Sequence, residues 1–220
     1  MRKFKTFDDY VKARQVRAAD PPVSRKIRLA STNQQLNLKD GTFYWAYGSN
    51  LSEEAMTGEH GRCKGAIKIQ RLTLNDGALV FRGVADVVAR KGATVHGGLW
   101  WINREHEATL DAYEGVRSQF YLKRYLRLRF AGIEKPYPCL YYTMTMRRGV
   151  MPPSEGYLQT LVEGYRDFDL PLEALEQALT ESWEDKTPTP LLRERHKRRG
   201  GRMAQTIVMD PEGLSYGEEK

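Results

Sequence analysis

The sequence predicts an α+β fold in which mostly antiparallel strands form a small β-barrel, with helices at its side. Short apolar and aromatic stretches alternate with turn signals between residues 43 and 146, as expected for antiparallel strands. Two amphipathic helical patterns follow at 154–168 and 171–183. The chain has 220 residues and no internal repeat, which suits one domain with extensions.

Charge divides the chain into three expected parts: a basic N-terminal extension at 1–42, a domain at 43–185 and a basic C-terminal extension at 186–220. The net charge of +7 lies in the flanks, since 1–42 carries ten Lys or Arg against four Asp or Glu. The middle part carries seventeen against nineteen. A nearly neutral middle fits a small-molecule pocket better than a nucleic-acid groove.

In the N-terminal extension, Thr6 is placed to cap a short amphipathic helix that ends near Ala18. The stretch 24–40 is polar, basic and rich in Gln and Asn, so we expect a loop or strap. The domain then begins with an aromatic strand at 43–47 and a short helix at 52–60.

Four short strands are expected next, at 64–72, 79–81, 86–89 and 95–102. Asn75-Asp76-Gly77 and Arg90-Lys91-Gly92 are typical turn sequences and are expected to separate them. Asn103 then predicts the start of a helix that runs to 113, with Gly115 as its C-terminal break.

The last part of the domain predicts a strand pair at 121–130 and 138–146, although Arg124 interrupts the apolar row of the first strand. Ser154 and Pro171 mark the starts of the two closing helices. A further short strand is expected at 204–209.

The most informative segment is 43–51, where the aromatic strand stops at Gly48-Ser49-Asn50 before a helix start. Such a turn directs several backbone N–H groups to one point, which suits a carboxylate or phosphate. Gly48 permits close approach of the backbone, and Ser49 and Asn50 add side-chain donors. An ordinary strand-to-helix turn, with Asn50 or Ser52 as its cap, is the alternative.

A second segment, 110–116, places Glu114 at a helix C-terminus against Gly115. The negative end of the helix dipole disfavours the charged carboxylate, and Asp111, one turn earlier, repels it. Both effects raise the pKa of Glu114 towards the range in which a carboxyl transfers protons at neutral pH. The alternative is a solvated carboxylate on a helix surface.

The sequence lacks the residue patterns of metal sites, of serine nucleophiles and of phosphate-binding P-loops. The four histidines show no metal-ligand spacing, Ser49 has no neighbouring histidine, and no P-loop or nucleophile elbow is present. Cys63 and Cys139 form no C-x-x-C pair, which favours two buried thiols over a disulfide. No apolar run is long enough to span a membrane and no signal peptide is visible, so a cytoplasmic protein is expected.

The basic cluster at 193–202 carries enough charge to contact phosphates, but it lacks interleaved aromatic residues. This pattern favours a solvated or partner-facing segment over a nucleic-acid site. The basic flanks are therefore candidates for contacting a partner or another subunit.

Taken together, these motifs resemble those of the gamma-glutamylcyclotransferase family. Tyr44-Trp45-Ala46-Tyr47-Gly48-Ser49-Asn50-Leu51 is similar to the family's aromatic-x-Ala-Tyr-Gly-Ser-Asn-Leu loop. The segment 110–116 matches the L-D-x-x-E-G-V element that holds the family's catalytic glutamate. Further matches in the family's order lie at 95–101, 139–144, 152–157 and 170–171. The resemblance leaves the flanks uncovered, and Gly-Ser-Asn indicates the general γ-glutamyl type.

The resemblance implies an enzyme that cyclises a γ-glutamyl small molecule to 5-oxoproline and releases an amine or amino acid, a lyase or acyltransferase type of reaction without metal or cofactor. Glu114 takes the family's general acid/base position. The implied substrate-binding residues are Tyr47, Gly48, Ser49, Asn50 and Leu51, and the candidate pocket residues are Tyr121, Tyr142 and Tyr157.

Two other functions stay open from the sequence. A non-catalytic member of the same fold would bind a γ-glutamyl or other carboxylate ligand, or a protein. Glu114 argues against this alternative, because an acidic side chain facing an anionic ligand does not strengthen binding. An enzyme of related chemistry would remove a γ-glutamyl group from a large dedicated substrate, with the flanks as a lid or docking surface.

Overall fold

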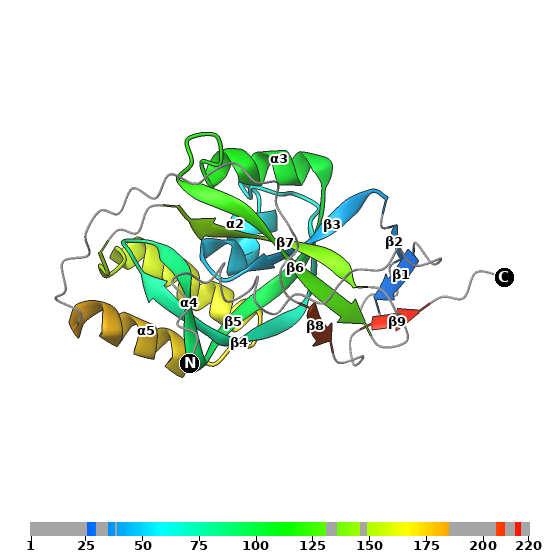
Figure 1. The fold of residues 1–220 in the computed structure, drawn as a ribbon. Helices are drawn as coiled ribbons and strands as arrows, with labels where there is room; N and C mark the ends of the chain where they lie inside the picture. The colour runs from blue at the N-terminus through cyan, green and yellow to red at the C-terminus, as the bar shows by residue number, and fades with distance from the viewer. Residues whose placement is uncertain are drawn as a thin grey trace.

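The computed structural model describes residues 26–29, 35–37, 39–130, 136–145, 149–184, 206–209 and 214–216. Most strands lie in one sheet, in the order β4-β5-β3-β7-β6-β8. Its strands are β3 (Gly41–Ala46), β4 (Ile67–Phe81), β5 (Ala85–Asn103), β6 (Tyr121–Phe130), β7 (Tyr137–Met144) and β8 (Thr206–Met209). Helices lie beside it (Figure 1), so the predicted α+β class is confirmed.

The sheet is mostly antiparallel, as predicted, with parallel pairing only between β3 and β7 and between β6 and β8 among the described strands. Its barrel is not closed. Within the described part of the chain, β4 and β8 stand at opposite ends of the strand order and pair with different neighbours. The fold is therefore a curled open sheet, and the barrel of the prediction is only partial.

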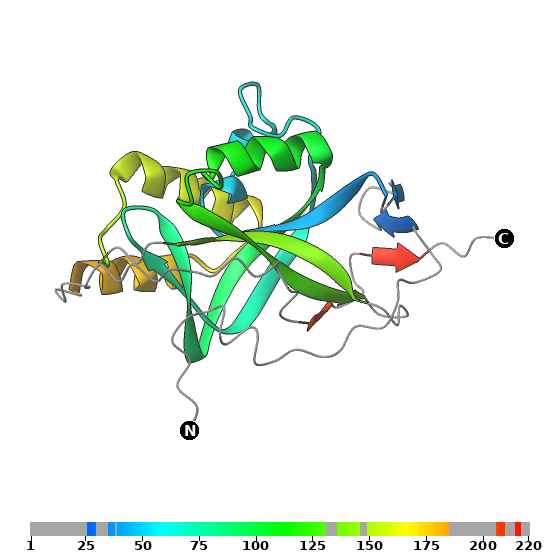
Figure 2. The same cartoon turned by 45° about the horizontal axis from the view of Figure 1, so that its top comes forward.

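The helices begin and end close to the predicted residues. They are the 3₁₀ turn η1 (Ser49–Leu51) and the helices α2 (Glu53–Thr57), α3 (Arg104–Tyr113), α4 (Glu155–Asp167) and α5 (Leu172–Glu184). Ser52, Asn103 and Ser154 accept backbone N–H groups as N-caps, which satisfies donors that the first turn leaves free. Figure 2 shows α3 over one side of the sheet, away from α5.

The predicted turns at 75–77 and 90–92 are wrong, because β4 and β5 run through both segments as one long hairpin. Asp76 (φ 58°) alone stands opposite the four β5 residues 90–93, and its Oδ1 accepts the N–H of Gly92 (φ 81°) at 2.7 Å. The turn sequences thus form an irregularity across the hairpin. The actual turn lies at 82–84, between the two strands.

The loop expected at 24–40 is also wrong where the structure describes it. β1 (Lys26–Leu29) pairs with β2 (Gln35–Asn37) and with β9 (Leu214–Tyr216), and all of these pairs are antiparallel. Backbone pairing with a distant segment explains why local composition did not predict these strands. The helix expected from Thr6 to Ala18 and the basic cluster at 193–202 lie outside the described residues.

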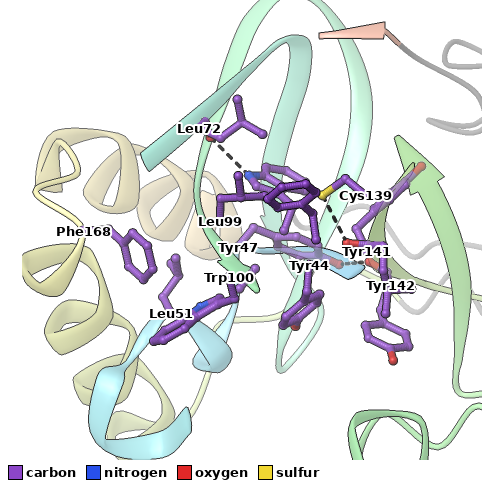
Figure 3. Packing of buried hydrophobic residues seen from close by; sticks show 14 of the residues in the cluster. Tyr44, Tyr47, Leu51, Leu72, Leu99, Trp100, Cys139, Tyr141, Tyr142 and Phe168 are labelled. Atoms are coloured by element: carbon purple, nitrogen blue, oxygen red, sulfur yellow. Dashed lines mark hydrogen bonds between the residues drawn. The ribbon is translucent and has the colours of Figure 1, made fainter. Parts of the chain in front are cut away.

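The core combines aromatic and aliphatic side chains and includes residues between the sheet and α4 (Figure 3). Trp45 and Trp100 are fully buried, and the indole of Trp100 lies edge-on to Phe168, with ring centroids 5.3 Å apart. Gly164 lets α4 approach η1, since a Cβ there would lie 2.4 Å from Cβ of Leu51. This packing fixes the turn at the end of β3. Cys63 and Cys139 are free and buried.

Candidate active site

A cavity of about 260 Å³ opens where β3 ends in η1 and α3 ends at Glu114. It brings together two segments that are distant in the sequence, the Gly-Ser-Asn turn and the helix end. The predicted site residues that line it are Tyr47, Gly48, Ser49, Asn50, Glu114, Tyr121, Tyr142 and Tyr157. Leu51 does not line it; its side chain is fully buried in the core.

Hydrogen bonds from Leu51 and Trp100 fix the backbone of the turn at Gly48 to Asn50. The N–H of Leu51 donates to the Gly48 carbonyl (2.9 Å), and Nε1 of Trp100 donates to the Asn50 carbonyl (3.0 Å). At Gly48, a Cβ would lie 3.1 Å from the Tyr157 hydroxyl and 3.4 Å from Cβ of Ala85. Because its φ of −112° suits any residue, glycine is needed here for space rather than for its backbone freedom.

Glu114 ends α3, and its N–H donates to the Leu110 carbonyl (2.8 Å). The positive φ of Gly115 (62°) then turns the chain away. Oε1 of Glu114 accepts a hydrogen bond from Nδ2 of Asn50 (2.9 Å). Burial raises the pKa of Glu114 to about 7, against the opposing effects of Arg62 and of the Asn50 hydrogen bond.

The predicted rise in that pKa has a different cause from the one inferred from sequence. Asp111 does not act as an unpaired negative charge, since its Oδ2 accepts from Lys123 Nζ (2.6 Å) and its Oδ1 from the Tyr142 hydroxyl (2.8 Å). Removal of Glu114 from water is the main cause, not repulsion by Asp111. Asp111 thus anchors the pocket wall.

The pocket tyrosines form a wall of neutral, hydrogen-bonded hydroxyls. Tyr47 donates to the Tyr142 carbonyl (2.7 Å) and Tyr121 to the Ala85 carbonyl (2.6 Å). The Tyr157 hydroxyl accepts the N–H of Ala85 (3.1 Å), and burial raises its pKa to about 12. Tyr47, Tyr121 and Tyr142 also have raised pKa values because they are buried. These groups therefore stay protonated at neutral pH.

Sequence reasoning missed several lining residues: Tyr44, Val84, Ala85, Tyr113 and Phe120. Tyr113 and Phe120 directly precede predicted site residues, and this proximity was a usable signal. Val84 ends the hairpin turn and Ala85 begins β5, and neither carries a polar side chain, so nothing in the sequence marked them.

Arg62 was also missed, and it contacts the site without lining the cavity. Its Nη1 donates to Oδ1 of Asn50 (3.1 Å), and its guanidinium lies 3.8 Å from the centre of the Tyr113 ring. The loop after α2 brings it there, and no motif marked this loop.

The arrangement can hold an anionic group and move a proton. The residues of the Gly-Ser-Asn turn and neutral tyrosine hydroxyls line the cavity together with one carboxyl whose pKa is raised to about 7. Among the residues that the structure describes, no cluster of His, Cys, Asp or Glu is arranged to bind a metal ion. None of the helices described here has the length and apolar character to span a membrane.

Comparisons with known proteins found one family model and several similar proteins. The model of the AIG2-like family matches residues 94–177. The chain is 31% identical over 155 residues to gamma-glutamylcyclotransferase of Bos taurus, covering 64% of this chain and 79% of that protein. It is 30% identical over 152 residues to gamma-glutamylcyclotransferase of Homo sapiens, covering 63% and 78%.

A solved structure of a gamma-glutamyl cyclotransferase superposes with a TM-score of 0.53. The match covers 75% of this chain and 94% of that chain, at 24% sequence identity. At this identity the likeness supports the fold.

Proposed function

Because this chain belongs to the gamma-glutamylcyclotransferase family, we propose that it cyclises a small γ-glutamyl compound to 5-oxoproline and releases a free amine or amino acid. The observation that carries the proposal is Glu114. A carboxyl with a pKa of about 7 lies in a cavity, hydrogen-bonded to the turn across from it. The Gly-Ser-Asn sequence of that turn favours the general γ-glutamyl type.

The α-carboxylate of the substrate binds at the backbone amides of Gly48, Ser49 and Asn50. Amides at the start of a helical turn favour an anion, and the absence of a Cβ at Gly48 leaves room beside Tyr157. The tyrosine wall surrounds the rest of the γ-glutamyl group. A cavity of about 260 Å³ suits this small group and leaves the amine to be released at its mouth.

The reaction then needs one proton shuttle. Glu114, as the carboxylate, takes a proton from the α-ammonium of the substrate. The resulting amine attacks the γ-carbonyl, so that a C–N bond forms in the five-membered ring and the amide bond to the leaving group breaks. Glu114 returns this proton to the leaving nitrogen as the amide bond breaks, and then carries the second proton that the ring nitrogen must lose, so that the products are the neutral lactam and the leaving amine as an ammonium ion. No metal or cofactor takes part.

The nucleophile and the carbonyl belong to one molecule, so orientation provides much of the acceleration. Well-placed intramolecular groups lower a barrier by roughly 7–11 kcal/mol. A positioned acid/base contributes about 10²–10⁴-fold. The rigid tyrosine wall supports the first effect and Glu114 the second.

The test is release of 5-oxoproline, followed by mass spectrometry, from a panel of γ-glutamyl amino acids, γ-glutamyl amines and glutathione. We expect Glu114→Gln to lower turnover by at least about 100-fold while the protein still unfolds in one cooperative thermal transition, because the amide keeps the shape but cannot accept the proton. Full activity in this variant would contradict the mechanism.

A matched control is Glu105→Gln, the same chemical change at an exposed position of α3. It should retain wild-type turnover. If the folded wild type releases no 5-oxoproline from any member of the panel, a large dedicated substrate or a binding role becomes the better explanation.

A further inference from the structure

The loop that carries Arg62 is anchored to α2 by its backbone. The N–H of Arg62 donates to the Ala55 carbonyl (3.0 Å), and the N–H of Cys63 donates to the Met56 carbonyl (2.7 Å). Met56 and Cys63 are fully buried. The backbone at Arg62 is therefore fixed, and its side chain starts from a defined point beside the turn at Asn50.

The Arg62 guanidinium is held by three elements. Nη1 donates to the Asn50 side chain in η1 (3.1 Å) and to the Ala55 carbonyl in α2 (3.3 Å). Nη2 donates to the Tyr113 hydroxyl in α3 (2.8 Å). Such a fixed guanidinium can orient the group that it contacts.

Arg62 decides which end of the Asn50 amide faces Glu114. A guanidinium has only donors, so the amide oxygen of Asn50 must face Arg62. The amide NH₂ is then directed to Glu114 Oε1 and to the Tyr44 hydroxyl, both at 2.9 Å. If the amide turned over, its oxygen would face the carboxylate and repel it.

We propose that Arg62 is a positioning residue for the reaction: by fixing the Asn50 amide, it keeps an N–H donor on Glu114 and holds this side chain as the carboxylate that accepts the substrate's proton. The inference rests on the proposed function only for the consequence in turnover. The geometry that supports it lies entirely within the free protein.

The other ionisable groups around Glu114 do not replace this cation. Five surrounding tyrosines stay protonated because burial raises their pKa values: Tyr44, Tyr47, Tyr121, Tyr142 and Tyr157. Burial also raises the pKa of Cys63, to about 11. On α3, Asp111 is paired with Lys123, and on β5, Asp86 is paired with Arg82. Within the described residues, Arg62 is the cation that lowers the pKa of Glu114.

The direct test is a ¹³C NMR titration of glutamate side-chain carboxyls in the full chain, with Glu114 assigned from the signal that Glu114→Gln removes. In Arg62→Met the midpoint of Glu114 should rise by about one pH unit, because its cation and its oriented donor are lost. In Arg62→Lys the midpoint of Glu114 should stay close to that of the wild type, since lysine keeps the positive charge and hydrogen-bond donors. Arg62→Gln, which removes the cation and leaves a shorter polar side chain, carries the same test should Arg62→Met fail to fold.

The pH dependence of kcat/KM gives the second readout. The acidic limb of this profile should move to higher pH together with the midpoint of Glu114. In Arg62→Met, kcat/KM should therefore be about tenfold below the wild-type value near pH 6 and approach that value towards pH 9. Arg71→Met, at an exposed arginine paired with Asp169, is the control and should move neither midpoint nor limb.

An unmoved Glu114 midpoint in a folded Arg62→Met or Arg62→Gln protein would overturn the proposal, and so would an equal loss of activity at every pH. The titration needs no turnover. A wild type that releases no 5-oxoproline would therefore refute the proposed function, while the NMR midpoint still decides the role of Arg62.

Discussion

At the scale of single residues, Glu114 is placed where a charged carboxylate is costly to the fold. It accepts a hydrogen bond from Asn50 and lies near Arg62, yet burial outweighs both and raises its pKa to about 7. A group whose folded pKa exceeds its unfolded value binds a proton more readily in the folded state. The same residue that suits proton transfer therefore destabilises the protein once it is ionised.

This gives a prediction for stability against pH. Between about 4.5, the ordinary pKa of the group, and about 7, the unfolded state has lost the proton that the folded state keeps, so stability falls as pH rises. Relative to Glu114→Gln, the wild type should lose about 3 kcal/mol of unfolding free energy between pH 4 and pH 8. Urea unfolding of both proteins at both pH values measures this difference. If the free energy of unfolding changes equally with pH in the two proteins, the pKa of Glu114 is not raised by folding.

Residues within short motifs were predictable from sequence, and residues brought in by tertiary structure were not. Gly48 and Glu114 each stand in a segment whose local order, strand to turn or helix to glycine, already defines their place. Arg62 and Ala85 reach the pocket only because a loop and a hairpin fold back on it. The cause of the Glu114 pKa shift was missed for the same reason, since burial is a property of the folded state.

At the scale of elements, the β4–β5 hairpin shows how a turn signal can mislead. Asn75-Asp76-Gly77 and Arg90-Lys91-Gly92 have turn composition, but both strands run through these segments and pair on either side of a local break in the register. The residues with positive φ serve a bulge instead. The helices were easier to predict, because caps such as Asn103 and Ser154 act locally.

Backbone conformation predicts opposite effects for two glycine substitutions, one at the bulge and one in α4. Gly92→Ala should destabilise the protein by about 1 kcal/mol, because its φ of 81° is unfavourable for a residue with a Cβ, although no atom lies within 4 Å of that position. Gly156→Ala, an exposed site in α4 that is also open, should stabilise by up to about 1 kcal/mol. Thermal or urea unfolding distinguishes them; a stabilising Gly92→Ala would contradict the assigned backbone conformation.

At the scale of the whole molecule, the flanks take part in the sheets. β8 extends the main sheet beside β6, and β9 joins β1 and β2 in the smaller sheet (Figure 1). The predicted division at 1–42, 43–185 and 186–220 stays a prediction about folding units. All pocket residues lie between Tyr44 and Tyr157, within its middle part.

Deleting residues 186–220 should therefore separate stability from chemistry. We expect the melting temperature to fall by roughly 5–10 °C, because pairing of β8 and β9 is lost. The unpaired edge of β6 should also promote self-association, visible by size-exclusion chromatography. Release of 5-oxoproline from small substrates should persist.

The control for this deletion removes only residues 217–220, which leaves β8 and β9 in place. It should match the full chain in melting temperature and in turnover. If the longer deletion abolishes turnover of small substrates while the protein stays folded, the flank contributes to the reaction itself.

The pairing of β1 with β9 also has a consequence for synthesis on the ribosome. About 190 residues separate Ile27 from its partner Tyr216, and at roughly 5–20 residues per second β1 waits about 10–40 seconds for that partner. The segments that line the pocket are translated well before β9. The nascent chain can therefore assemble its pocket first, and the smaller sheet closes last.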